Sequence, residues 1–314
     1  MKADRALPAA RAEAPDRLRS SRIRGARSRR WAGWLFVLPA LVTYAAFVLV
    51  PLAMTVQYST LRWNGIGEST FVGLDNYVRT LTDPTLLGVI GNAFKLIVFF
   101  CGVPVILGLL VASVIRRIAT GALGTATRTV LFLPQVIPLV AAGIMWTWLL
   151  SKNGLVNQVL GGVGLGGLTR TWLADFGLAL PAVGVIGAWV LLGLCTILLL
   201  TGMSKIDQAL YESARIDGAG AWQEFRSITV PSLRYELGVC ITVTVIASLA
   251  AFDIVYISTL GGPGTTTTVP GLEIFRLAFQ GRQVGLASAL AVVLVVLVLV
   301  AVLPIQRLTR EEPA

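Results

Sequence analysis

A polar stretch late in the chain reads, from Tyr211 to Pro231, YESARIDGAGAWQEFRSITVP. Two long apolar segments flank it, near 179–202 and 236–260. The loop between them, residues 203–235, carries charges of both signs, including Lys205, Arg215, Arg226, Arg234, Glu212, Asp217 and Glu224. Because charged side chains are costly inside a bilayer, this loop marks a water-exposed surface between two membrane segments, and its length suits docking of a soluble partner.

The composition is that of a membrane protein. Of 314 residues, 55% are hydrophobic and 13% are charged, and the mean hydropathy is +0.78. Those values exclude an ordinary soluble domain. The net charge of +10 does not indicate a nucleic-acid partner, because ten of the 26 Lys and Arg residues lie in the first thirty residues, where a cytoplasmic anchor carries them.

Metal and disulfide chemistry find no support in the sequence. The chain has no histidine, and its three cysteines, Cys101, Cys195 and Cys240, lie far apart inside apolar segments. Zinc sites and disulfide frameworks need closely spaced ligands or a secreted, cysteine-rich chain. We therefore expect no metal site and no catalytic residues, and we interpret the cysteines as small core hydrophobes.

Six apolar segments are long enough to cross a bilayer as helices, at about 31–56, 88–115, 130–150, 179–202, 236–260 and 285–304. A helix satisfies its own backbone hydrogen bonds, and apolar runs such as Leu290–Leu303 exclude a membrane β-barrel. The predicted fold is all-α, a polytopic membrane protein with six transmembrane helices over 31–304. Pro134 and Pro138 are expected to kink the third helix.

The ends of the chain are polar. Residues 1–30 are rich in Arg, Ala and Pro and predict a basic, disordered tail, and residues 305–314 form a short C-terminal segment. The first apolar segment is longer than the hydrophobic region of a signal peptide and lacks a small-residue cleavage site, so we expect it to be retained.

The distribution of basic residues predicts the orientation in the membrane. Six crossings place both termini on one side together with the loop 203–235, and that side carries 19 Lys and Arg residues against six on the other, with Lys95 inside a span. By the positive-inside rule the richer side is cytoplasmic. We expect a multi-pass protein of the cell membrane with both termini and the loop 203–235 in the cytoplasm.

The loop has the pattern of two short helices joined by a glycine turn. Ser204 and Asp207 suggest a capping box, after which Ile206, Leu210 and Ala214 fall on one helical face. Gly218 and Gly220 allow the left-handed backbone that ends a helix. A second helical stretch from about Ala221 carries Trp222, Phe225 and Ile228, and Pro231 marks its turn into the next span.

These residues resemble a known signature. Glu212-Ser213-Ala214, Gly218 six residues after the glutamate, and Ile228-Thr229-Val230-Pro231 are similar to the EAA motif of binding-protein-dependent ABC importer permeases, with Ser213 and Val230 as mild departures. The resemblance implies that the loop is the coupling helix that fits a groove on a cytoplasmic ATPase. It implies coupling roles for Glu212, Ser213, Ala214, Asp217, Gly218, Ala219, Ile228 and Pro231, with Glu212 making the charged contact.

Flanking segments extend the resemblance to most of the chain from Trp31 onward. They are Phe71–Tyr77, Asn92–Lys95, Phe132–Pro134, Gly154–Asn157, Phe252-Asp253 with Gly261–Pro263, and Ala287–Ala289, and they resemble the carbohydrate-uptake branch, the larger maltose and glycerol-3-phosphate permease subunits. That resemblance implies a type I ABC importer permease fold and ATP-driven import of a sugar or related small solute. It implies as partners two ATP-binding subunits, a second permease subunit expected to be a different chain, and an extracytoplasmic solute-binding protein.

Two glycine-rich stretches superficially resemble phosphate-binding loops. Gly162–Gly167 satisfies G-x-G-x-x-G but follows no predicted strand, so a turn between helices is the better interpretation. Gly261–Gly264 and the four threonines after it lack the lysine of a phosphate loop. The chain contains no G-x-x-x-x-G-K-[ST]. We therefore expect this chain to bind no cofactor, and ATP to be hydrolysed by a separate subunit.

Polar residues inside the spans are candidates for the solute path, because such groups are costly unless they face a cavity or a partner. The candidates are Asn92, Lys95, Gln135, Trp189, Asp253 and Tyr256, which offer hydrogen bonds and a stacking face to a sugar. A structural role is an alternative for two of them, since Lys95 near a helix end can reach the interface and Asp253 can cap or pair locally.

Three other functions remain open on the sequence alone. An ABC permease for a non-sugar solute such as a polyamine, phosphonate or peptide would share the loop. A secondary transporter would need ion ligands at mid-membrane, and the spans offer few. A membrane protein for assembly or sensing would recruit a partner through the loop without moving solute.

Overall fold

The computed structural model describes residues 34, 36–118 and 121–309. The chain divides into two compact units, Met1–Met54 and Thr55–Ala314, and each is described by itself. Helices make up nearly all of the regular structure, and the described part holds one sheet of two short strands. The prediction of an all-α fold is confirmed. The predicted tail, 1–30, and the last five residues of the C-terminal segment lie outside the described residues.

The first unit is helical over 36–54. A π-helical turn, η2 (Ala45–Leu49), precedes α2 (Val50–Ser59), which continues into the second unit. The helix Phe36–Ser59 has 24 residues and is apolar enough to cross a bilayer. Its large apolar side chains, among them Phe36 and Phe47, are exposed, as suits a helix that meets lipid or another protein.

Three helices of the second unit are also long and apolar enough to cross a membrane: Pro84–Arg116, α9 (Ala179–Met203) and α16 (Val284–Leu308). The first of these consists of α4 (Pro84–Ile97), a π-helical turn η3 (Val98–Gly102) and α5 (Val103–Ile118). Asp83 caps α4, because its Oδ1 accepts a hydrogen bond from the Thr85 N–H at 2.8 Å. The same bond lowers the pKa of the Asp83 carboxyl.

A bent helix pair follows α5. It consists of α6 (Gly121–Val136) and α7 (Leu139–Leu149), whose axes meet at 97°. Pro138 is the N-cap of α7. A proline has no backbone N–H to donate, and its ring disfavours a helical conformation of the preceding residue, Ile137. The expected kink in the segment 130–150 is therefore a full break, located at Pro138, while Pro134 stays inside α6.

A second bent pair includes the polar loop. α10 (Gln208–Ile216) is followed by α11 (Ala221–Glu224), a π-helical turn η5 (Phe225–Thr229) and α12 (Val230–Ser232). The axis then turns by 70° into α13 (Arg234–Leu249). The expected span 236–260 differs from this, since α13 ends at Leu249 and a separate short helix, α14 (Asp253–Ser258), begins after Phe252.

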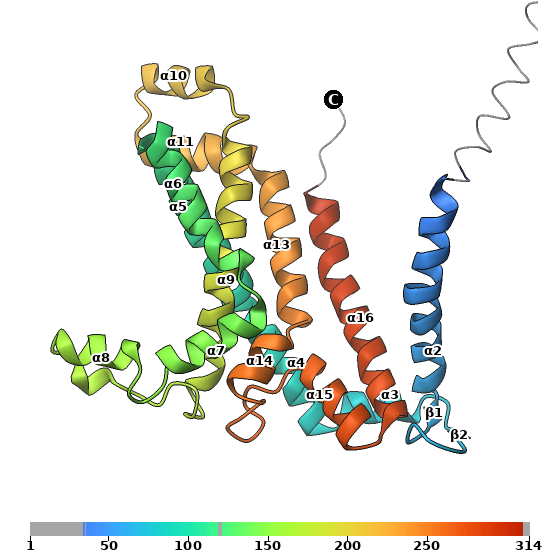
Figure 1. The fold of residues 1–314 in the computed structure, drawn as a ribbon. Helices are drawn as coiled ribbons and strands as arrows, with labels where there is room; N and C mark the ends of the chain where they lie inside the picture. Colours follow the sequence, from blue (N-terminus) through green and yellow to red (C-terminus); the bar gives the residue numbers. More distant parts are fainter. Residues whose placement is uncertain (1–33, 35, 119–120, 310–314) are drawn as a thin grey trace, which may run out of the picture. The chain divides into compact units, whose positions relative to one another are not determined.

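Short elements lie at the end of the second unit opposite α10 (Figure 1). They are β1 (Leu61–Arg62) and β2 (Thr70–Phe71), paired antiparallel with Leu61 opposite Phe71, then α3 (Asp75–Thr82), α8 (Leu155–Gly162), the 3-10 turn η4 (Gly166–Leu168), α14, α15 (Pro270–Phe275) and the π-helical turn η6 (Arg276–Gln280). The stretch Gly162–Gly167 thus ends α8 and begins a turn, and the strands β1 and β2 do not lead into it.

α9 is the centre of the packing. Its N-terminal third, with Val183 and Ile186, packs against Phe100 of η3 and Val255 of α14. Its C-terminal end, with Leu199, packs against Leu233 and the ends of α5 and α13. Glycines let neighbours approach α9 closely: a Cβ on Gly187 would lie 2.0 Å from the Phe100 ring. The three cysteines are buried and unpaired.

We expect Gly193→Ala to destabilise the protein. A Cβ at Gly193 would lie 1.9 Å from the carbonyl oxygen of Leu131 on α6, and a backbone atom cannot rotate away, so overpacking should cost about 1–3 kcal/mol. Gly91→Ala on α4 is the matched control, because nothing lies within 4 Å of its Cβ position. Thermal unfolding in detergent should show a lower Tm for Gly193→Ala alone. Equal Tm values would mean that α6 and α9 are not packed this closely.

Candidate functional site

The first helix of the polar loop begins at Asp207. Its carboxylate Oδ1 accepts a hydrogen bond from the Ala209 N–H at 3.0 Å, which caps α10. The expected capping box from Ser204 is wrong, because the Ser204 hydroxyl instead donates to the Leu200 carbonyl at 2.9 Å, at the end of α9. α10 therefore starts three residues later than the sequence pattern indicates.

The turn after α10 requires a glycine. The Ala219 N–H donates to the Ala214 carbonyl at 2.8 Å and the Gly218 N–H to the Arg215 carbonyl at 3.1 Å, the paired bonds of a Schellman motif. Gly218 has φ +83°, a left-handed conformation that strains any residue with a Cβ. No atom lies within 4 Å of its Cβ position, so a substitution there would act through the backbone and not through a clash.

An ion pair between an exposed arginine and a buried glutamate holds the two helices of the loop together. Arg215 Nε donates to Glu224 Oε1 at 2.7 Å, and Glu224 is only 4% exposed. The Glu224 carboxylate raises the pKa of the Arg215 guanidinium. Gly220 starts α11, and its N–H donates to Gln223 Oε1 at 2.8 Å. α10 and the segment α11–η5–α12 thus form one unit, the hairpin (208–232).

Tyr211 fastens the hairpin to the membrane helices. Its side chain is buried, its hydroxyl lies 3.0 Å from Thr229 Oγ1, and the guanidinium carbon of Arg116, on α5, lies 4.2 Å from its ring centroid. Lys205, just before the hairpin, pairs with Glu236 on α13 at 3.3 Å. These contacts tie the hairpin to α5 and place it at one end of the second unit (Figure 1).

The outer surface of the hairpin holds most of the predicted coupling residues. Glu212, Ser213, Asp217, Gly218 and Pro231 are exposed, and Ala214, Ala219 and Ile228 are partly buried. The exposed side chains include large apolar ones, Leu210, Ile216 at 86% and Trp222 at 68%. Trp222 stacks on Phe225 with ring centroids 5.4 Å apart. The surface thus combines acidic and apolar groups.

A cavity of about 540 Å³ lies at two helix breaks, the one at Pro138 between α6 and α7 and the one between α13 and α14. Its lining includes Val136, Ile137 and Pro138 from the first break and Ala250, Ala251 and Phe252 from the second, with α9 behind them. Among the six predicted path residues, Gln135 and Asp253 line it. Gln135 Oε1 is buried without a hydrogen-bond partner in the described part of the protein. The cavity is mostly apolar with these two polar groups beside it.

The other four predicted path residues are not among those that line this cavity. The Asn92 side-chain amide donates to the carbonyls of Thr265 and Thr268 at 3.2 and 3.0 Å, and Lys95 is exposed. Trp189 meets Trp146 edge-on at 5.7 Å, and Tyr256 stacks on Phe252 at 5.3 Å. The two hydrogen bonds of Asn92 therefore anchor the loop that contains Thr265 and Thr268.

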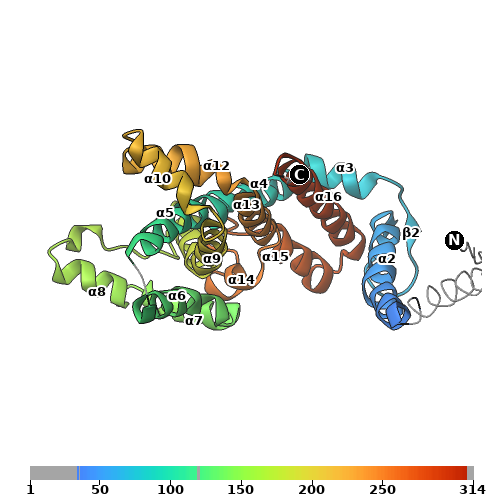
Figure 2. The ribbon, with the colours of Figure 1, turned by 90° about the horizontal axis from the view of Figure 1, so that it is seen from above.

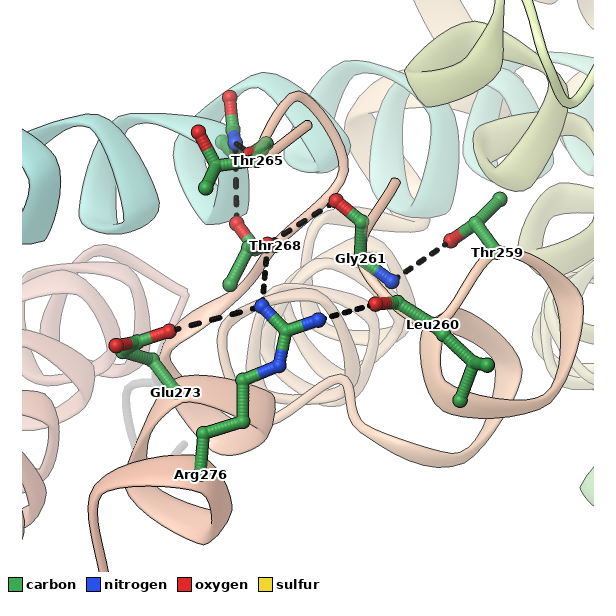
Figure 3. A network of polar contacts seen from close by, with 8 residues as sticks. Thr259, Leu260, Gly261, Thr265, Thr268, Glu273 and Arg276 are labelled. Carbon is green, nitrogen blue, oxygen red and sulfur yellow. Dashed lines mark hydrogen bonds and ion pairs between the residues drawn. The ribbon is translucent and has the colours of Figure 1, made fainter. Parts of the chain in front are cut away.

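The loop that Asn92 anchors runs from Thr259 to Thr268 and is held on its other side by Arg276 (Figure 3). Arg276 donates to the Leu260 carbonyl and, at 3.4 Å, to Thr268 Oγ1, and it lies 4.0 Å from Glu273. Burial raises the pKa of the Glu273 carboxyl, and Arg276 opposes that shift. The glycine-rich stretch Gly261–Gly264 is thus a fixed structural loop.

Known proteins share this architecture. Residues 105–310 match the family model described as "Binding-protein-dependent transport system inner membrane component". The chain belongs to this family. It is 34% identical to the probable ABC transporter permease protein YurN of Bacillus subtilis (strain 168) over 268 residues. That matched region covers 85% of this chain and 91% of YurN. It is 33% identical over 273 residues to the diacetylchitobiose uptake system permease protein NgcF of Streptomyces coelicolor, a region that covers 83% of this chain and 77% of NgcF.

Solved structures show the same fold. The permease superposes on a chain from a bacterial ABC transporter involved in the import of the acidic polysaccharide alginate, with a TM-score of 0.77 and 25% identity over 93% of this chain and 100% of that chain. A bacterial alginate ABC transporter in complex with an alginate pentasaccharide-bound periplasmic protein gives a TM-score of 0.76 at 25% identity, covering 90% and 95%. The permease therefore has the type I ABC importer permease fold.

Both parts of the candidate site lie inside the region that matches the family model. The hairpin and the two helix breaks all fall within residues 105–310. The permease is thus a membrane component of an ABC importer.

We expect Glu224→Gln to loosen the hairpin of the permease. The substitution replaces the charged hydrogen-bond partner of Arg215 with a neutral amide, and a hydrogen bond between two charged groups is stronger than one with a neutral partner. Hydrogen exchange should become faster over residues 208–229. Glu212→Gln is the control on the same hairpin, since Glu212 is exposed, and it should leave the exchange unchanged. Equal protection in Glu224→Gln and the parent chain would remove the ion pair from the account of the hairpin.

Proposed function

We propose that the permease is one of two membrane halves of an importer that moves a carbohydrate into the cell, driven by a separate ATPase through the hairpin. The observation that carries the proposal is the hairpin itself, a braced two-helix surface with exposed acidic and apolar side chains at one end of the membrane helices. A loop without such a task would need neither the ion pair between Arg215 and the buried Glu224 nor the exposed Ile216 and Trp222.

In this proposal the exposed face of α10 fits a groove on the ATPase. Glu212 makes the charged contact, Ser213, Ala214, Asp217, Gly218 and Ala219 shape the turn, and Ile228 and Pro231 carry the motion into α13. Ile216 and Trp222 add apolar contact area, which the sequence pattern did not assign. Since the hairpin is tied to α5 and runs into α13, a displacement of α10 moves both membrane helices.

The partners follow from the same proposal. Two ATP-binding subunits bind and hydrolyse ATP, and this chain, which has no phosphate-binding motif, holds no cofactor. A second permease subunit of different sequence completes the membrane pathway. An extracytoplasmic binding protein delivers the solute, in line with the periplasmic protein named for a structural relative. ATP and the loaded binding protein must favour the same conformation, because coupling between two sites is reciprocal.

The orientation is likewise a proposal. Both termini and the hairpin lie in the cytoplasm, as the excess of 19 over six basic residues supports. The six spans, about 31–56, 88–115, 130–150, 179–202, 236–260 and 285–304, form one permease domain over 31–304, with the coupling loop at 203–235, the basic tail at 1–30 and the C-terminal segment at 305–314.

The cavity at the helix breaks is the proposed solute path. Non-helical backbone at membrane depth is tolerated only where it is buried in protein or lines a water-filled cavity, and both breaks line this one. Gln135 and Asp253 supply hydrogen bonds there, and Phe252 supplies a stacking face for a sugar ring. Carbohydrate as the class of solute is supported by the named substrates of the relatives, diacetylchitobiose and alginate.

An uptake panel tests the class of solute. Labelled mono- and oligosaccharides and glycerol-3-phosphate would be offered to cells that lack the gene and to cells in which it is restored. Loss of uptake of one or a few sugars, recovered on restoration, is the expected result. Unchanged uptake of every carbohydrate would overturn the sugar assignment and favour a permease for another solute.

Coupling through the hairpin has its own test. We expect Glu212→Lys to abolish ATP-driven uptake by the reconstituted transporter, since it reverses the charge offered to the ATPase while leaving an exposed position folded. Glu68→Lys, an equally exposed acid between β1 and β2, is the control and should transport normally. Normal transport by Glu212→Lys would defeat the coupling role of Glu212.

A further inference from the structure

α3 is amphipathic in the reverse of the usual sense. Its polar residues Asn76 and Thr80 are 8% and 0% exposed, whereas Leu74 at its N-cap, Val78 and Leu81 are 69%, 57% and 55% exposed. A surface helix of a soluble protein turns its apolar stripe inward and its polar residues to water. This helix does the opposite, so something other than water is expected to cover the exposed stripe.

The orientation of α3 is fixed by the buried polar side. Asn76 Nδ2 donates to the carbonyls of Ser59 and Leu61 at 2.8 and 2.9 Å, and the Thr80 hydroxyl donates to the Asn76 carbonyl at 2.8 Å. Tyr77 OH lies 2.5 Å from Ser59 Oγ. The bond of Thr80 lies within α3, but rolling the helix to bury the apolar stripe would break the hydrogen bonds that Asn76 and Tyr77 make with Ser59 and Leu61. Leaving such buried polar groups unpaired is costly.

Charged residues mark a third side of α3. Leu74, Val78 and Leu81 follow the i, i+4, i+7 spacing of one stripe, and Asp75 and Arg79 each come one residue later, about 100° around the helix. Both charged residues are exposed, and Asp75 pairs with Arg62 at 3.2 Å. The helix thus has one side for protein, one for water and one for an apolar medium.

The apolar stripe leads directly to a membrane-spanning surface. Only Asp83 separates α3 from α4, the first part of the span Pro84–Arg116. On this span the side chains of Leu87, Phe94 and Val98, the last at the start of η3, are exposed at the same helical spacing. α3 extends sideways when the long helices are viewed along their axes (Figure 2). Tyr58 and Trp63 come shortly before α3 in the sequence, and their ring centroids lie 4.9 Å apart. Tyr and Trp side chains favour the membrane–water interface.

We propose that α3 lies flat in the surface layer of the bilayer, with Leu74, Val78 and Leu81 among the acyl chains and Asp75 and Arg79 in the headgroup region. An amphipathic helix at an interface buries its apolar face about 5–10 Å into the boundary between headgroups and acyl chains. The occupant of the stripe is therefore phospholipid. α3 anchors the start of α4, and through Asn92 of α4 it steadies the loop Thr259–Thr268.

Spin labels test this placement in the full-length chain. Single cysteines would replace Leu74, Val78 and Leu81 on the stripe and Asp75, Arg79 and Thr82 beside it, in the transporter complex reconstituted into phosphatidylethanolamine–phosphatidylglycerol vesicles. Collisions of each label with oxygen, which concentrates in lipid, and with a water-soluble nickel chelate would be measured. The parent chain, whose three cysteines are buried, controls for background labelling.

The expected result is a helical alternation. Labels at 74, 78 and 81 collide more with oxygen than with the nickel chelate, and labels at 75, 79 and 82 show the reverse. Two outcomes would overturn the proposal. Nickel collisions at 78 as frequent as those at 79 would place the stripe in water, and low collision rates with both reagents at 74, 78 and 81 would show that a protein partner covers it.

Discussion

Inside a bilayer the backbone has no water to bond to, so each N–H and C=O group must find its partner within the protein. The long helices of this permease meet that demand along their own length. The two places where they do not, at Pro138 and between Leu249 and Asp253, lie against the same cavity and against the same helix, α9. The cost of interrupting two spans is thus concentrated where a polar solute would gain from exposed backbone groups. Packing around α9, with its glycines in contact with neighbouring backbone and rings, holds the breaks in place.

The proposed coupling role sets the hairpin a different physical problem, that of passing a movement from a soluble partner into the membrane helices. A flexible loop would absorb a push, whereas two helices closed by a Schellman turn, an ion pair and a buried tyrosine move as one piece. The 70° turn into α13 then changes the direction of that movement. Glu224 is central here, because a carboxylate so deeply buried is stable only with its partner in place.

Much of this could be predicted from the sequence, for identifiable reasons. Hydropathy located the apolar segments because a helix in lipid needs a long run of apolar side chains. Gly218 located the turn because the left-handed conformation there favours glycine over other residues. The end of α13 at Leu249 was missed, since Ala250-Ala251-Phe252 contains neither glycine nor proline. At the break Gly271 of α15, distant in the sequence, comes so close that an added Cβ would lie 2.9 Å from the Ala251 carbonyl oxygen, and such an approach leaves no signal at residues 250–252.

The solute path was the least predictable part. A polar residue within a predicted span is a candidate for the path, but the sequence does not show what its side chain contacts. Asn92, for example, donates its hydrogen bonds to carbonyls more than 170 residues away in the chain. Gln135 and Asp253 reached the cavity because each sits beside a helix break, and only one of those breaks is signalled by a proline. The inward polar face of α3 was missed for the same reason, since a hydropathy pattern identifies a stripe but not the side on which protein lies.

The π-helical turn η3 (Val98–Gly102) changes the register of the span that contains it. Such a turn holds one residue more than an α-helical turn, and this shifts every later side chain by about 100°. Leu87 and Phe94 before the turn, Val98 at its first position, and Ile106, Leu110 and Val114 after it are all exposed, and the extra residue brings the two stripes toward one side. A deletion of a single residue there would rotate the whole of α5, so that Ala112 and Ile115 left the core and lipid-facing side chains entered it. The extra residue of η3 therefore decides which side chains of α5 face the interior of the protein.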